Sequence, residues 1–184
     1  MVQDYRDFLA EVLISEEDLQ RRITEMGEEI SNDYQGEEKL LLVCILRGGV
    51  MFLTDLMRQI HHPHAIEFMA VSSYGAGTTT SGAVKINKDL NEDITGRHVI
   101  IVEDILDSGV TLSYLCGYLE NRKPASITLV TLLDKPARRK APVKADFIGF
   151  EVPDEFVVGY GLDYAEKYRN LPFVGILKPE VYSA

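Results

Sequence analysis

Acidic residues follow an apolar segment near the middle of the chain. Residues 99–102 read V-I-I-V, an unbroken β-branched run that is typical of a strand covered on both faces of a parallel sheet. Glu103 and Asp104 come where this run stops, and Asp107 follows after two aliphatic residues. Carboxylates accept hydrogen bonds from hydroxyl groups, so the adjacent pair suits a diol.

The segment Asp107-Ser108-Gly109-Val110-Thr111 is expected to lead into a helix, because apolar residues recur behind it at helical spacing. The first N–H groups of a helix are unpaired, and the helix dipole places positive potential there. The segment is therefore a candidate anion site. Together with the two carboxylates it suits a ribose 5-phosphate. The alternative is an ordinary strand-to-helix turn in which Asp107 caps the helix.

A second loop of this kind follows the apolar run at residues 40–46. It reads Arg47-Gly48-Gly49 and precedes a helical pattern over residues 50–60. A glycine pair here lets the backbone approach a ligand closely, with N–H groups free to meet an anion. A tight strand-to-helix turn is the alternative.

Residues 72–87 are rich in glycine, serine and threonine in a chain that otherwise uses short loops. A loop of this length is usually a linker or a functional lid. Because the flanking strands belong to one pattern, we expect a mobile lid in which Ser73 and Tyr74 close over a ligand.

The elements that position these segments alternate between strands and helices. Ser15 and Asp18 resemble a capping box at the start of an amphipathic helix that continues to Ile30. The basic run at 138–144 is interpreted as a solvated surface turn. In an open α/β sheet, ligands bind at the carboxyl ends of the strands, where the candidate loops lie. Strands are expected at residues 40–46, 65–71, 99–102 and 126–133, with short strand-like runs at 145–150, 156–160 and 173–177.

Composition limits the class of protein. With 184 residues and 46% hydrophobic side chains, the chain is expected to form one domain over residues 1–184. A net charge of −10 argues against a nucleic-acid partner, which needs a basic face. An acidic protein that binds a polyanion needs local cations, so a divalent metal is implied.

The N-terminus and the cysteines indicate a cytoplasmic protein without a membrane partner. The first ten residues lack the basic and apolar regions of a signal peptide, and no apolar run approaches the roughly 18 residues of a membrane span. Cys44 and Cys116 lie among apolar residues and are expected to be reduced core residues.

Several segments resemble one known family. Residues 99–112 resemble the signature with which type I phosphoribosyltransferases bind phosphoribosyl pyrophosphate: an apolar run, two acids, two aliphatic residues and D-S-G-x-T. The resemblance implies the α/β fold of this family, an open and mostly parallel sheet flanked by helices, with a small hood built from the terminal segments. Its hypoxanthine-guanine branch is indicated by the segments at 46–49, 72–75 and 134–136, and above all by 146–164.

The resemblance, which covers about residues 15–177, also implies an activity. This is the Mg²⁺-dependent transfer of the 5-phosphoribosyl group from phosphoribosyl pyrophosphate to N9 of hypoxanthine, and of guanine, in purine salvage. The implied partners are these small molecules and further copies of the same chain, in a homodimer or homotetramer. Two alternatives stay open: a regulatory protein on the same fold that senses phosphoribosyl pyrophosphate without turning it over, and a phosphoribosyltransferase that prefers xanthine or guanine.

For the ribose half of the site, the resemblance implies that Glu103 and Asp104 hold the ribose hydroxyls, directly or through magnesium. Residues 107–111 would bind the 5-phosphate through N–H groups and the hydroxyls of Ser108 and Thr111. Asp107 would also take a proton from the purine N7 as N9 attacks the anomeric carbon, and would stabilise a cationic ribosyl transition state.

For the leaving group, the resemblance implies that the peptide at Arg47-Gly48 points its N–H at the pyrophosphate and that Arg169 pairs with it. Asp163, beside the purine site, would ligate a magnesium ion bound to pyrophosphate. The implied metal ligands are thus Glu103, Asp104 and Asp163. The family more commonly has lysine where Arg47 stands, which leaves any contact of that side chain open.

For the base, the resemblance implies that Lys135 lies at the purine 6-position, where its donors favour an oxo group over an amino group. Phe156 would stack on the purine ring, and main-chain groups of Val157 would meet its edge. Without the surrounding motifs, Lys135 and Arg169 would be interpreted as surface charges.

Overall fold

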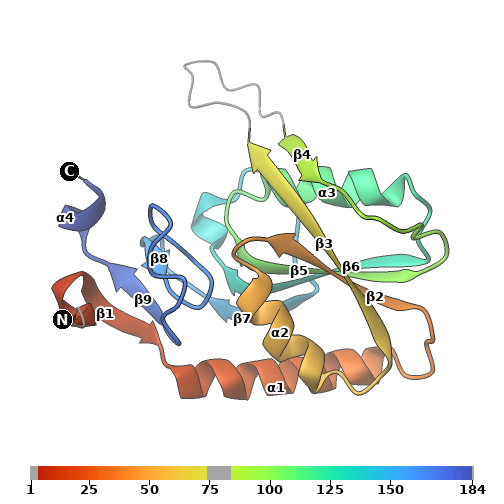
Figure 1. Cartoon of the computed structure of the whole chain (residues 1–184), viewed down its shortest axis with the longest axis horizontal. Coiled ribbons are helices and arrows are strands. Elements are labelled where there is room, and N and C mark those ends of the chain that lie inside the picture. The colour runs from red at the N-terminus through yellow and green to blue at the C-terminus, as the bar shows by residue number, and fades with distance from the viewer. Residues whose placement is uncertain (1–3, 74–83, 184) are drawn as a thin grey trace.

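The computed structural model describes residues 4–73 and 84–183, and its main element is a six-stranded sheet in the order β4-β3-β2-β5-β6-β7 (Figure 1). The neighbouring strands of this sheet are parallel, except that β4 is antiparallel to β3. In chain order the strands are β2 (Leu40–Leu46), β3 (His64–Ser73), β4 (Val84–Lys88), β5 (His98–Leu106), β6 (Ser126–Asp134) and β7 (Phe147–Glu151).

Helices cover both faces of this sheet, as the unbroken apolar strands require. On one face, the buried residues of α1 (Glu16–Asp33) and α2 (Val50–Gln59) pack with Leu42 and Ile100. On the other face, those of α3 (Val110–Glu120) pack with Leu41 and Ile101. Successive strand residues point to opposite faces, so one apolar run supplies both cores. The predicted open, mostly parallel sheet flanked by helices is confirmed.

Helix α1 begins as the sequence predicts. The Ser15 hydroxyl oxygen accepts a hydrogen bond from the Asp18 N–H at 3.1 Å, and the hydroxyl donates to the Asp18 carboxylate at 2.7 Å. These contacts satisfy one of the free N–H groups at the helix start.

A second, antiparallel sheet joins the two ends of the chain (Figure 1). We call this unit, residues 5–14 and 157–182, the hood. Its own small core contains Phe8, Leu9, Val158 and Leu177. The predicted hood from terminal segments is thus confirmed. In the order β1-β9-β8, its strands are β1 (Leu9–Ile14), β9 (Val174–Leu177) and β8 (Val157–Val158), flanked by the 3-10 helix η1 (Tyr5–Asp7) and the short helix α4 (Pro179–Tyr182).

Some predicted boundaries differ from the structure. The loop expected over 72–87 is shorter, because β3 continues to Ser73 and β4 begins at Val84. The strand expected over 156–160 has only two residues, since Gly159 (φ +100°) turns the chain away. Among the described residues, no helix is both long and apolar enough to cross a membrane.

The connections of the sheet reverse direction between β2 and β5. From β2 the chain passes through α2 to β3 on one side, and from β5 it passes through α3 to β6 on the other side. Strands β2 and β5 pair only as far as Cys44 and Val102, so their carboxyl ends separate. Such a reversal is where open α/β sheets bind ligands.

Candidate active site

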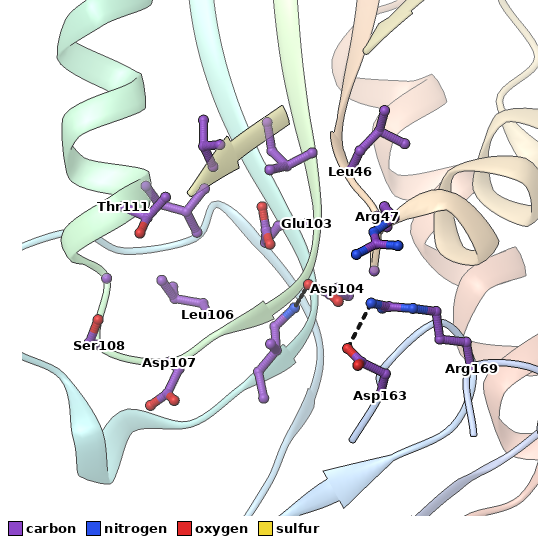
Figure 2. Close-up of a pocket in the computed structure, with 16 residues that line it drawn as sticks. Leu46, Arg47, Glu103, Asp104, Leu106, Asp107, Ser108, Thr111, Asp163 and Arg169 are labelled. Atoms are coloured by element: carbon purple, nitrogen blue, oxygen red, sulfur yellow. Dashed lines mark hydrogen bonds and ion pairs between the residues drawn. The ribbon is translucent and has the colours of Figure 1, made fainter. Parts of the chain in front are cut away.

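The opening between β2 and β5 is a pocket of about 320 Å³. Its walls come from four parts of the chain: the end of β2, Val71 of β3, the segment from Glu103 to Leu112, and the hood (Figure 2). It brings together most residues that the sequence predicts for ribose and pyrophosphate. They are Arg47, Gly48, Glu103, Asp104, Asp107, Ser108, Gly109, Thr111, Asp163 and Arg169.

The acidic pair lies inside strand β5 and not after its end. The prediction that the strand stops at Val102 is wrong, because pairing with β6 continues as far as Leu106, opposite Asp134. The side of β5 that faces β2 has lost its partner by this point, which leaves room beside Glu103 and Asp104.

Asp104 is buried, and Glu103 is half-buried with its Oε2 atom shielded from solvent. Burial is the main cause that raises the pKa of Glu103 well above its ordinary value, and the neighbouring Asp104 adds to it. Burial also raises the pKa of Asp104, against the opposing effect of hydrogen bonds and of Arg169. One oxygen of Glu103, Oε2, has no hydrogen-bond partner. A buried polar atom without a partner is costly, which is consistent with a site that a ligand completes.

The backbone at Gly48 lies directly against Asp104. A Cβ atom added at Gly48 would overlap the Asp104 carboxylate, so this position requires glycine. The peptide bond between Leu46 and Arg47 is cis. Because residue 48 is glycine, the chain presents backbone, and not a side chain, to Asp104.

The candidate phosphate loop leads into α3 as predicted. Gly109 has φ +76° and is the N-cap of the helix, which begins at Val110 and has no side-chain cap. The interpretation of Asp107 as a helix cap is therefore wrong. Val110 donates weakly to the Ser108 hydroxyl oxygen at 3.4 Å, and Thr111 in the first turn lines the pocket. The start of α3 thus lies at the pocket, where its backbone N–H groups can donate hydrogen bonds to an anion.

A smaller pocket of about 190 Å³ adjoins the first. Ile105, Asp107 and Asp163 line both, so the two pockets form one continuous site. The Oδ1 atom of Asp107 is buried and has no hydrogen-bond partner. The other walls of the smaller pocket come from Lys135, Arg138, Glu155, Phe156, Val157 and Leu162.

The residues predicted for the base meet in this smaller pocket. Lys135 is only 5% exposed, and its Nζ donates to the Glu155 carbonyl at 2.8 Å. Burial lowers the pKa of Lys135, and the Asp107 carboxylate opposes that shift. Phe156 is 37% exposed and Val157 is buried in β8. The pocket therefore offers an apolar ring and a buried donor.

Aromatic residues of the hood hold Phe156 in place. Tyr182 of α4 stacks on it, with ring centroids 5.1 Å apart and an angle of 25° between the planes. Tyr164 meets it edge to face at 5.6 Å. No sequence pattern points to Tyr182, because a single tyrosine outside any motif does not indicate a site.

Two arginines lie where the hood meets the first pocket. Arg169 pairs with Asp163 at 2.8 Å (Figure 2), and it donates to the Gly161 carbonyl at 2.7 Å. Arg47 pairs with Glu166 at 2.7 Å and is largely exposed. The carboxylates of Asp163 and Glu166 thus hold the two cationic groups at the pocket.

The residues predicted for a lid are only partly described. Ser73 is the last residue of β3, and Tyr74 lies outside the described residues. Their role as a lid stays a prediction.

The predicted metal ligands do not form a ready-made cage. Among the described residues, no three histidine, cysteine or acidic side chains are grouped so that they could hold a metal ion. Mg²⁺ usually binds through one or two carboxylates together with water and substrate phosphates. The unpartnered oxygen of Glu103, next to Asp104, fits such a shared site.

Arg139 lies close to the candidate phosphate loop, a position that no pattern in the sequence predicts. It belongs to the basic run at 138–144 that we interpreted as solvated, but its side chain is only 20% exposed and contacts the backbone of Leu106 and Asp107. Arg138, its neighbour in the same run, is 54% exposed. Composition does not distinguish two adjacent arginines, because only the fold decides which of them turns inward.

Comparison with known proteins agrees with this geometry. Residues 15–165 match the family described as "Phosphoribosyl transferase domain". The hypoxanthine-guanine phosphoribosyltransferase of Bacillus subtilis is 54% identical over 176 residues, which are 96% of this chain and 97% of that protein. The bifunctional protein TilS/HprT of Listeria monocytogenes is 55% identical over 175 residues, which are 95% of this chain but only 27% of that protein.

A solved structure shows the same likeness. The hypoxanthine phosphoribosyltransferase of Staphylococcus aureus superposes with a TM-score of 0.95 at 50% identity, over 100% of both chains. Sequence, fold and site agree, and the chain belongs to the phosphoribosyltransferase family.

Proposed function

We propose that this protein transfers the 5-phosphoribosyl group from phosphoribosyl pyrophosphate to N9 of hypoxanthine or guanine and releases pyrophosphate, a reaction of purine salvage. The observation that carries the proposal is the position of Asp107. It lines both the first pocket and the smaller pocket, and one of its oxygens is buried without a partner. A group placed in this way can act on both substrates at the point where the new bond forms.

In the first pocket, Glu103 and Asp104 accept hydrogen bonds from the ribose hydroxyls. The backbone and hydroxyls of residues 107–111 bind the 5-phosphate at the start of α3, where no cationic side chain is needed because the helix supplies N–H groups and positive potential. This leaves the anomeric carbon of the ribose directed toward the smaller pocket.

In the smaller pocket, Phe156 stacks on the purine, and Tyr182 supports Phe156 from its other ring face. Lys135 donates to the 6-oxo group, and main-chain groups of Val157 meet the edge of the base. A lysine offers donors only, so adenine, whose 6-amino group is itself a donor, is disfavoured. The pocket is thus suited to 6-oxopurines.

The reaction breaks the bond between the anomeric carbon and the pyrophosphate oxygen and forms the bond from that carbon to N9. The proton at N7 passes to the Asp107 carboxylate. The same carboxylate stabilises the positive charge that develops on the ribosyl group. Burial without a hydrogen-bond partner leaves this oxygen available for both roles.

The departing pyrophosphate is held by backbone N–H groups at Arg47 and Gly48 and by Arg169. We propose Mg²⁺ as the cofactor, with Glu103, Asp104 and Asp163 as the groups that hold it together with substrate oxygens. When bound, it neutralises part of the negative charge of the leaving group. Arg169 exchanges its contact with Asp163 for one with pyrophosphate.

The test is product formation by the whole chain. With phosphoribosyl pyrophosphate and Mg²⁺, we expect nucleotide from hypoxanthine and guanine and none from adenine, measured by chromatography. No nucleotide from either 6-oxopurine would overturn the proposal. Binding of phosphoribosyl pyrophosphate without any product would favour the regulatory alternative, and faster turnover of xanthine would favour a xanthine-preferring enzyme.

We further propose that the enzyme is cytoplasmic and forms a homodimer or homotetramer, which its membership of the family supports. Light scattering on the purified protein tests the oligomeric state. A single species of 20.7 kDa would contradict it.

A further inference from the structure

The guanidinium of Arg139 is bound to the backbone behind the active site. Its Nε donates to the Asp107 carbonyl at 3.0 Å, and its Nη2 donates to the Leu106 carbonyl at 3.3 Å. Its Nη1 donates to the Val143 carbonyl at 2.8 Å, and the Asp134 carboxylate completes the set as an ion pair. One side chain thereby contacts four separate acceptors.

The fold brings these groups together at the carboxyl ends of β5 and β6. Leu106 and Asp134 lie opposite each other in register as the last residues of the two strands. The chain then makes the 3-10 helix η2 (Pro136–Arg138), which returns Arg139 to the end of β5. The Arg139 and Asp134 side chains are 20% and 14% exposed. An ion pair shielded in this way is screened less than one on the open surface.

The residues after Arg139 hold the same loop. The N–H groups of Lys140 and Ala141 donate to the Ser108 carbonyl at 2.8 Å and 3.2 Å. A Cβ atom at Gly109 would lie 2.5 Å from the Val143 Cγ1, so the loop and this segment are in close contact. The segment 139–143 therefore supports the backbone of residues 106–109.

These contacts aim groups that the reaction uses, although Arg139 is not among the described residues that line either pocket of the site. The carbonyl that it holds belongs to Asp107 itself. A planar guanidinium with five fixed donors can hold several acceptors in set directions, which a lysine ammonium on a flexible stem cannot do. Because residues 107–111 contain no cationic side chain, their position depends on backbone contacts of this kind.

We propose that Arg139, itself fixed by Asp134, is a positioning residue that sets the Asp107 carboxylate and the phosphate-binding backbone for the transfer reaction. This inference rests on the function proposed above. It predicts that the number of donors and their geometry matter at this position, and not positive charge alone.

The first test compares Arg139→Lys with Arg122→Lys. Arg122 also forms a partly shielded ion pair, with Asp89, but it lies in the turn after α3 and lines neither pocket. We expect Arg139→Lys to lower kcat and to raise the KM for phosphoribosyl pyrophosphate, with a loss in kcat/KM on the order of 100-fold, because a small misplacement of reacting groups has this effect. The KM for hypoxanthine stays within about twofold, since Lys135, Phe156 and Val157, which hold the base, lie outside the loop that Arg139 supports.

Arg122→Lys should leave all three constants near those of the unchanged enzyme. If Arg139→Lys retains its kcat/KM, or raises both KM values equally with no change in kcat, Arg139 does not position the loop and the proposal is wrong. Thermal unfolding of both variants shows whether a general loss of stability accounts for the difference.

A second measurement does not need activity, so it separates this proposal from the proposed function. Asp134→Asn removes the charge that fixes Arg139 but leaves the arginine in place. We expect hydrogen exchange at the Lys140 and Ala141 amides to become at least about tenfold faster, while exchange in α1 stays unchanged. If exchange at these two amides stays the same, the positioning role is wrong, whatever the activity of the enzyme. If the protein without substitutions forms no nucleotide, the proposed function is wrong, whatever the exchange rates.

Discussion

At the scale of single residues, the site contains ionisable groups that the protein alone does not satisfy. Glu103 and Asp107 each bury an oxygen without a partner, and Lys135 is buried with a single carbonyl as its acceptor. Buried charges in proteins are normally paired, because removing them from water is costly. The exceptions here all face the two joined pockets, so a ligand that carries hydroxyls, a proton and an oxo group would supply the missing contacts.

Lys135 gives a prediction about pH. Its pKa is lowered by burial, so it loses its proton at a lower pH than an ordinary lysine, whose pKa is 10.5. Only the protonated form is a charged donor to the 6-oxo group. We expect kcat/KM for hypoxanthine to fall on the alkaline side below pH 10.5, through the lowered pKa of this lysine.

Lys135→Arg is the matched control, because a guanidinium keeps its proton throughout this range. The variant should bind the base less well, but its kcat/KM should not show the decrease at high pH that is due to Lys135. The ionisation of hypoxanthine lowers kcat/KM equally for both enzymes. Superimposable alkaline limbs for the two enzymes would show that Lys135 does not make this contact.

Glycine positions give a second prediction. Gly48→Ala places a methyl group on the Asp104 carboxylate, so we expect kcat/KM for phosphoribosyl pyrophosphate to fall and the free energy of unfolding to decrease by about 1 to 3 kcal/mol. Gly117→Ala in α3 has no atom within 4 Å of the added Cβ. It should increase the free energy of unfolding by about 0.5 to 1 kcal/mol with unchanged kinetics. Unfolding in urea and steady-state rates check both, and a Gly48→Ala enzyme with full activity would contradict the close approach described here.

At the scale of elements, the hood is attached to the main sheet by specific contacts. The Tyr160 hydroxyl donates to the Asp55 carboxylate of α2, which also accepts from Gln20 of α1 at 3.1 Å. Tyr160 is 3% exposed, and burial together with Asp55 raises the pKa of its hydroxyl, which therefore remains a donor. This contact sets the hood, and with it Phe156 and Asp163, relative to Asp107.

Tyr160→Phe keeps the ring and removes the hydroxyl, with its contact to Asp55 and a weak one to the Met51 carbonyl. We expect a decrease in the free energy of unfolding of about 1 kcal/mol, because the half-buried Asp55 loses one of its donors. We also expect a higher KM for hypoxanthine, whose pocket includes hood residues. Tyr114→Phe serves as the control, since Tyr114 is 44% exposed on α3. Equal KM values for the Tyr160→Phe enzyme and the unchanged enzyme would show that this contact does not position the hood.

Elements with local signals could be predicted from the sequence, and those with distant partners could not. The capping box gave the start of α1, and unbroken apolar runs gave the central strands. Strand β1 was missed because it pairs only with β9, from the other end of the chain, and two irregularities interrupt its register. Strand β4 was missed because its pairing with β3 is not visible in a segment rich in glycine and serine. The end of β5 was placed too early because pairing with β6, and not hydrophobicity, carries it through the acidic pair.

Within the site, the same distinction holds. Motif residues such as Asp107, Lys135 and Asp163 could be named because each follows a recognisable segment, and the structure brings them to joined pockets. Arg139 and Tyr182 could not be named, because their importance depends on contacts with Asp107 and Phe156, which lie far away in the sequence.

At the scale of the whole molecule, a protein with a net charge of −10 is proposed to bind a polyanion. The helix start of α3 and the cations Arg47 and Arg169 supply local positive potential, but the carboxylates of Asp163, Glu166 and the acidic pair surround them. We propose that divalent cations resolve this conflict, because they can lie between carboxylates and phosphates.

Removal of divalent cations therefore provides a prediction for the complete enzyme. We expect a chelator to abolish nucleotide formation and Mg²⁺ in excess to restore it, while the circular dichroism spectrum of the free protein stays the same. Undiminished turnover in the chelator would contradict the metal requirement.

The central claim is that the two joined pockets are the halves of one active site and that Asp107 acts where they meet. The most direct test is Asp107→Asn, with kcat measured in the steady state and affinity for phosphoribosyl pyrophosphate measured by calorimetry. Asparagine keeps the size and the loop contacts but cannot take the proton, so we expect kcat to fall on the order of 10²- to 10⁴-fold while the dissociation constant changes by no more than about threefold. An equal loss in turnover and in binding, or unchanged turnover, would contradict the claim.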